Sequence, residues 1–130
     1  MTRINVIPVE ELADQHLMAE YRELPRVFNQ KVDTTNAPTC YKLGKGHVKW
    51  AKLHIKYLHD RYYKIVKEMQ YRGFRTAFTD ISHIDVNYGK NYIPTIYDIL
   101  INRERISEKY KMKPSWYKWT KREIPLWLKH

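Results

Sequence analysis

The strongest constraint on the fold is a long amphipathic pattern in the middle of the chain. Apolar residues recur there at alternating intervals of three and four, the period of one face of an α-helix. They are Val48, Ala51, Ile55, Leu58, Tyr62, Ile65 and Met69. The pattern predicts one helix from about Gly46 to Arg72. Gly73 can then adopt the left-handed conformation that ends many helices, with Phe74 folding back over the last turn.

Two further segments carry a helical pattern. The first covers about residues 9–32 or 13–32 and contains Pro25, where the missing amide donor should bend the helix rather than end it. The second covers about residues 94–111. The segments between the helices, 33–46 and 75–91, are expected to be loop or irregular chain.

Length and helix content together predict the organisation of the chain. Its 130 residues fit one domain, and long helices without a strand pattern predict an all-α fold, a compact single domain over residues 1–130 with three main helices. No run approaches the length of a membrane span and the start lacks a secretory signal, so we expect a cytoplasmic protein that is intracellular and not secreted. A chain this small and this charged is expected to be a monomer. Cys40 is the single cysteine, and no His or Cys pair has metal-ligand spacing, so no metal site is predicted.

The chain is strongly basic, with 24 Lys and Arg against 14 Asp and Glu, a formal charge of +10. Such an excess favours a polyanionic partner, either nucleic acid or an acidic membrane surface. Lysines opposite the apolar stripe of the middle helix either form a simple solvated face or turn towards that partner; they are Lys49, Lys52, Lys56, Lys64 and Lys67. Near the C-terminus, Trp116, Tyr117 and Trp119 either stack on bases or pack the tail onto the core.

Two features near the N-terminus carry candidate chemistry. Thr2 is small, so removal of Met1 would leave a free α-amine, which is roughly a tenth uncharged at neutral pH and is a usable nucleophile. Position 2 alone does not distinguish this chain from the many that begin Met-Thr. Glu23 lies on the first helix between Arg22 and Arg26. It forms either a surface ion pair of little consequence or a carboxylate held ionised beside a reaction centre.

Two polar residues precede Glu23 on or near the same helical face. His16 lies seven residues before it, with Glu20 between them. His16 either bonds Glu20 one turn away or acts with a carboxylate in acid catalysis. Gln15 is near this face and can donate hydrogen bonds to a backbone or to a base edge.

Several motifs resemble a known family of DNA-repair enzymes. The opening Met-Thr-Arg-Ile-Asn and the run from Glu11 to Phe28 are similar to the pyrimidine-dimer DNA glycosylases with AP lyase activity, the family of endonuclease V of T-even phages. Shorter matches follow in the family's order: Gly44-Lys45-Gly46-His47-Val48, Arg72-Gly73-Phe74, Tyr92-Ile93-Pro94, Glu108-Lys109 and Pro114-Ser115-Trp116-Tyr117-Lys118. The loop at 29–43 is shorter and less basic than in the phage enzyme, and segment 75–91 diverges.

The resemblance implies a fold and a reaction. An N-terminal segment threaded between the helices brings the amine of Thr2 close to Glu23. The amine attacks the anomeric carbon of the 5′ nucleotide of a cyclobutane dimer, displaces the base and forms an imine with the opened sugar, after which β-elimination cuts the strand. Glu23 stabilises the cationic sugar and assists proton transfer, and His16 supports the lyase step. No metal or organic cofactor is implied.

The resemblance also implies how DNA is held. Family positions that clamp phosphates match Arg3, Arg22, Arg26, Arg105 and Lys109, and we expect Gln15 and Lys118 to add contacts. The expected partner is double-stranded DNA containing pyrimidine dimers, sharply kinked, with the base opposite the lesion flipped out. One alternative is a non-catalytic basic helical protein that binds nucleic acid, which leaves Thr2 and Glu23 unexplained. Another is an enzyme of the same fold that acts on a different base lesion.

Overall fold

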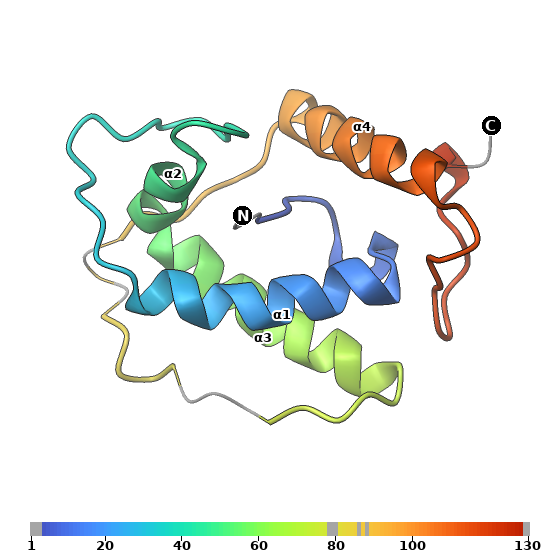
Figure 1. The fold of residues 1–130 in the computed structure, drawn as a ribbon. Helices are drawn as coiled ribbons and strands as arrows, with labels where there is room; N and C mark the ends of the chain where they lie inside the picture. The colour runs from blue at the N-terminus through green and yellow to red at the C-terminus, as the bar shows by residue number, and fades with distance from the viewer. Residues whose placement is uncertain (1–3, 78–80, 86, 88, 129–130) are drawn as a thin grey trace.

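The computed structural model describes residues 4–77, 81–85, 87 and 89–128 of the chain. Over these residues all regular structure is helical, which confirms the predicted all-α class (Figure 1). The elements are η1 (Val9–Glu11), α1 (Asp14–Asn29), α2 (His47–Leu53), α3 (Ile55–Tyr71), α4 (Ile96–Met112) and η3 (Leu126–Leu128). None of the helices so described is both long and apolar enough to cross a membrane.

The predicted middle helix is in fact two helices, so the described chain has four α-helices where three main ones were expected. The break lies at His54, whose φ of −107° and ψ of 43° leave helical geometry and whose Nδ1 bonds Trp50 O at 2.8 Å. The distant backbone N–H of Lys90 donates to Leu53 O at 2.9 Å and so satisfies a carbonyl beside the break. Apolar spacing continues across the break, which is why periodicity misses it.

The first helix is shorter than predicted. It begins at Asp14, after the separate turn η1, and ends at Asn29, three residues before the expected limit of 32. It runs on past Pro25, as expected. The side-chain amide of Asn29 donates to Pro25 O at 3.0 Å, a local bond that competes with continued helix, and Gln30 is extended.

The other helix ends follow from local residue chemistry. Gly73 has a φ of +87° and Phe74 N–H donates back to Met69 O at 2.9 Å, which confirms the predicted left-handed end of α3. α4 begins one or two residues after its predicted start. There the Thr95 hydroxyl accepts from the backbone of Asp98, and the Asp98 carboxylate accepts from the backbone of Thr95.

The main core lies where α1 packs against α3, with α2 and the N-terminal segment completing it (Figure 1). Its largest fully buried apolar side chains include Ile4, Ile7, Leu12, Leu17, Leu24, Trp50, Leu58, Tyr62 and Ile65. The predicted lysine face of α3 is exposed at Lys56, Lys64 and Lys67. Lys52 of α2 differs, because its Nζ donates to Val27 O and Phe28 O at 3.1 and 3.2 Å and so caps the end of α1.

The N-terminal residues 4–7 are buried and bonded to two long helices that flank them (Figure 1). The N–H groups of Val6 and Ile7 both donate to Oδ1 of Asn102 on α4, at 2.7 and 3.1 Å. The carbonyl of Ile7 accepts from Arg61 on α3 at 2.9 Å. An extended segment therefore has its backbone polar groups satisfied by side chains, as burial demands.

Acidic residues anchor the C-terminal tail to the start of α1 and the end of α3. Glu68 accepts two hydrogen bonds from Arg122, at 2.9 and 2.8 Å, and one from Arg72 at 2.8 Å. Asp14 accepts from the Thr120 hydroxyl at 2.6 Å and from Arg72 at 2.9 Å. The tail is thus fixed by charge-assisted bonds, which are stronger than neutral ones.

The tail aromatics differ in burial, and stacking on bases by any of them stays a prediction. Trp119 is buried, and its indole donates to Glu11 O at 3.0 Å, so it packs the tail onto the core. The Trp127 indole donates to the carboxylate of Glu11, also at 3.0 Å. Trp116, by contrast, is 56% exposed and keeps its face available to solvent.

Glu68 should make stability depend on pH in the acid range. Burial would raise the pKa of Glu68, but hydrogen bonds from Arg122 and Arg72 lower it below the ordinary value of 4.5. Its stabilisation is therefore complete well above pH 4.5 and is lost as pH falls through the lowered folded-state value. Glu68→Gln should lower the free energy of unfolding by about 1–3 kcal/mol at neutral pH, because Arg72 and Arg122 each lose a carboxylate partner while Arg72 keeps its pair with Asp14.

Urea unfolding of both proteins as a function of pH checks this. The difference between the wild type and Glu68→Gln should shrink below pH 4.5. Glu108→Gln, an exposed change on α4, serves as the control and should leave the pH profile unaltered. A difference that stays constant through the acid range would contradict the assignment.

Candidate active site

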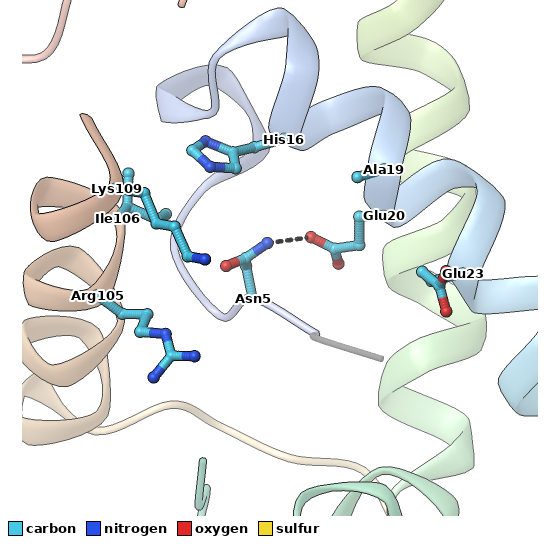
Figure 2. A pocket seen from close by; sticks show the side chains of 8 residues that line it. All are labelled: Asn5, His16, Ala19, Glu20, Glu23, Arg105, Ile106 and Lys109. Carbon is cyan, nitrogen blue, oxygen red and sulfur yellow. Dashed lines mark hydrogen bonds between the residues drawn. The ribbon is translucent and has the colours of Figure 1, made fainter. Parts of the chain in front are cut away.

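A cavity of about 380 Å³ opens where the N-terminal segment, α1 and α4 meet (Figure 2). Its lining residues are Asn5, His16, Ala19, Glu20, Glu23, Arg105, Ile106 and Lys109. Four predicted site residues are therefore brought together here, although two come from α1 and two from α4, more than eighty positions later: His16, Glu23, Arg105 and Lys109. The cavity has carboxylates on one wall and cations on the other.

Glu23 is the carboxylate at the mouth of this wall. Its side chain is 23% exposed and its Oε1 accepts from Arg26 at 3.1 Å. Arg26 is 73% exposed, so the pair is screened by water and contributes little to stability. The surface ion pair that the spacing allowed is present, and the same carboxylate also lines the cavity.

Glu20 lies deeper on the same wall, and its carboxylate is occupied by hydrogen bonds within the protein. It is 1% exposed, and its Oε1 accepts from Asn5 Nδ2 at 2.9 Å (dashed in Figure 2). Arg61 of α3 donates to both of its oxygens. Burial alone would lower the pKa of Arg61, but the Glu20 carboxylate and its hydrogen bonds raise it, so the guanidinium stays charged. Glu23 is therefore the carboxylate of this wall that a ligand can reach.

The tail supports the start of α1 beside the cavity. The His16 ring stacks on Tyr117, with ring centroids 4.9 Å apart and planes inclined by 20°. Gln15 uses both ends of its amide on the tail backbone: Nε2 donates to Trp116 O at 2.7 Å and Oε1 accepts from Lys118 N–H at 3.2 Å. A residue expected to contact DNA thus has a structural task, and its DNA contact stays a prediction.

Arg105 and Lys109 form the cationic wall. They lie one turn apart on α4, and both side chains extend towards the cavity (Figure 2). Nε of Arg105 is buried and has no hydrogen-bond partner among the described residues. A guanidinium and an ammonium one turn apart suit the oxygens of a phosphate, and a cavity between them and Glu23 suits a sugar-phosphate.

The other predicted site residues that the structure describes do not line the cavity. Arg22 and Arg26 are exposed on α1, and Lys118 is exposed on the tail. Thr2 and Arg3 lie outside the described residues. Among the described residues no cluster of His, Cys, Asp and Glu could hold a metal ion.

Sequence reasoning missed the polar groups beneath the cavity. Glu20 stands between Leu17 and Leu24 at helical spacing, and Arg61 stands likewise between Leu58 and Ile65. Opposite charges on two apolar stripes, one on each, indicate a buried ion pair. Asn5 and Asn102 gave no such sign, because their side-chain bond, 2.8 Å long, joins positions 97 residues apart.

Comparison with protein families identifies the family of the chain. A family model described as pyrimidine dimer DNA glycosylase matches residues 1–82, well over half of the chain. The chain belongs to the pyrimidine dimer DNA glycosylase family. It is therefore a DNA-repair glycosylase whose substrate class is DNA bearing pyrimidine dimers. The matched range includes the carboxylate wall of the cavity and ends before α4, so the roles of Arg105 and Lys109 depend on the geometry.

The cationic wall predicts how binding responds to salt. Lys109→Gln should weaken binding of a duplex containing a pyrimidine dimer and should lower the slope of log K against log salt by about 1, because one phosphate contact is lost. Titrations at several salt concentrations measure the slope. Lys111→Gln is the matched control, since this exposed lysine of α4 points about 200° away around the helix. Equal slopes for wild type and Lys109→Gln would count against the contact.

Proposed function

We propose that this glycosylase is bifunctional: it removes the base through an imine formed by the α-amine of Thr2 and then cleaves the strand as an AP lyase. The amine bonds to the anomeric carbon of the 5′ nucleotide of the dimer while the glycosidic bond breaks, and the base leaves with the bonding electrons and takes up a proton. Opening of the sugar ring gives the imine. Loss of a proton from C2′ then expels the 3′ phosphate by β-elimination.

The position of Glu23 on the cavity carries this proposal. Asn5 lines the same cavity, and Thr2 precedes Asn5 by three residues. Covalent geometry limits the Cα atoms of Thr2 and Asn5 to a separation of about 11 Å. The amine therefore belongs to a short stretch of chain attached at the cavity wall. A carboxylate there stabilises the cationic sugar as it forms and accepts the protons that the reaction releases.

The other groups of the site have supporting roles. The proposal assigns Arg105 and Lys109 to the phosphates beside the lesion, with Arg3, Arg22, Arg26, Gln15 and Lys118 as further contacts along the duplex. His16, held flat against Tyr117, faces the sugar and assists elimination. The reaction needs neither a metal nor an organic cofactor, since the amine supplies the nucleophile and the imine that it forms accepts the electrons released in the elimination. A net charge of +10 opposes self-association, so the enzyme acts as a monomer.

Borohydride reduction tests the imine. Incubating protein lacking Met1 with dimer-bearing duplex and borohydride should give a covalent protein–DNA adduct, and peptide mapping should locate it at the N-terminal residue. Protein that retains Met1 is the matched control and should give no adduct at Thr2. Correctly processed protein that yields no adduct, or an adduct at a lysine, would refute the mechanism. Nicking of UV-irradiated plasmid separates the enzyme from a non-catalytic binding protein, because a protein that only binds DNA leaves the plasmid supercoiled.

Replacement of the carboxylate tests the role of Glu23. Glu23→Gln should slow base release by about 100-fold or more, because it removes both the charge and the proton acceptor. Affinity for the damaged duplex should change little. Glu104→Gln on α4 is the control, since Glu104 is exposed and does not line the cavity. Base release at the wild-type rate by Glu23→Gln, measured in a single turnover, would remove Glu23 from the mechanism.

A further inference from the structure

We propose that His47 is a positioning residue for the N-terminal nucleophile, acting by holding the backbone of Ile4. The inference rests on the proposed function, because it concerns where the amine of Thr2 is held. His47 belongs to α2 and does not line the cavity, and the mechanism above gives it no task. His47 nevertheless bonds Ile4, the described residue that is nearest in sequence to Thr2.

The ring of His47 is fixed by hydrogen bonds at both nitrogens. Ile4 N–H donates to Nε2 at 2.8 Å, and Nδ1 lies 2.7 Å from Lys42 O. Because the Lys42 carbonyl can only accept a hydrogen bond, Nδ1 carries the proton. Because the Ile4 amide can only donate one, Nε2 is unprotonated and accepts it. One neutral tautomer satisfies both bonds. The ring thus links a loop carbonyl to the N-terminal backbone through a rigid spacer.

Tyr41 holds the other polar group of the same residue. Its hydroxyl donates to Ile4 O at 2.7 Å, and its ring meets the ring of His47 edge-on, with centroids 5.8 Å apart. Ile4 itself is fully buried. With its N–H, C=O and side chain all held, Ile4 is a fixed point two residues from Thr2 in the sequence.

The surroundings of His47 keep the ring in place. It is 4% exposed and stacks on Trp50, with centroids 6.0 Å apart and planes inclined by 16°. The preceding Gly46 has a φ of +92°, and a Cβ there would approach Pro38 Cγ to 3.2 Å. Only glycine takes this left-handed turn cheaply, and the turn delivers His47 to the start of α2.

Loss of the hydrogen bond between His47 and Ile4 should affect only the N-terminal end of the chain. Asn102 and Arg61 independently hold the backbone of residues 6 and 7, so loss of the His47 bond leaves that part of the segment anchored. The Cα of Thr2 is at most about 7.6 Å from the Cα of Ile4. A small rotation at Ile4 therefore displaces the amine by about 1 Å or more, and a misplacement of that size costs about 100-fold in rate.

Single-turnover kinetics with borohydride trapping test the inference. His47→Leu should slow adduct formation with dimer-bearing duplex by about 10- to 100-fold. His47→Gln should recover most of the rate, because its side-chain oxygen can accept from Ile4 N–H. Tyr41→Phe, which keeps the ring, should slow the reaction in the same direction but less. Binding of a duplex with a reduced abasic site, whose C1′ aldehyde has become an alcohol that cannot form an imine, should be unchanged in all three.

His54→Leu is the matched control. His54 is 3% exposed and also packs against Trp50, but its Nδ1 bonds Trp50 O and not the N-terminal segment. The His54→Leu variant should lose stability as His47→Leu does. It should keep the wild-type rate of adduct formation at temperatures where both variants are folded. Equal rate losses in the two leucine variants, or a wild-type rate in both His47→Leu and Tyr41→Phe, would overturn the positioning role. Failure of the wild type to form an adduct would instead refute the proposed function, and this inference with it.

Discussion

The buried ion pair between Glu20 and Arg61 is the interaction on which the rest of the structure depends. Moving two charges out of water costs several kcal/mol for each ion, and attraction between them offsets this only when their remaining hydrogen-bonding groups are also satisfied. Here the additional partners come from the N-terminal segment: Asn5 donates to Glu20, and Ile7 O accepts from Arg61. The pair thus needs that segment in place, and it is one of the anchors of the segment, beside the bonds with Asn102, His47 and Tyr41.

This arrangement separates the two carboxylates of α1 by function. Arg61 neutralises Glu20, so the floor of the cavity adds little negative potential, and Glu23 is left as the reachable acid group. Asn102 extends the same network to α4, which otherwise meets the helical core mainly through the N-terminal segment and the tail. The distance between the acidic and basic walls is therefore set by side-chain amides rather than by direct helix packing.

The sequence predicted most of the helices and only part of the site. Apolar spacing placed α1 and α3 because one apolar face of each is buried, and Gly73 marked a helix end because its left-handed conformation is a local property. The bounds of α4 came from local start and stop signals, since its buried residues are Asp98, Asn102 and Ile106, whereas Ile96 and Leu100 are exposed. The break at His54 escaped because its causes, such as the bond from Lys90, come from distant chain. Likewise the seven-residue interval between His16 and Glu23 predicted that they share one face of a helix. No local pattern predicted that Arg105 and Lys109 would lie across the cavity from them.

The attachment of the tail has a consequence for how the enzyme is made. Asp14 and Glu68 pair with Thr120 and Arg122, and Gln15 with the backbone at 116–118, so the start of α1 is supported by residues about a hundred positions later in the chain. Contacts between positions this far apart form late, because a long loop must close first. A growing chain therefore carries its basic surface before the support for the start of α1 is in place, and that support forms only after residues 116–122 have been synthesised.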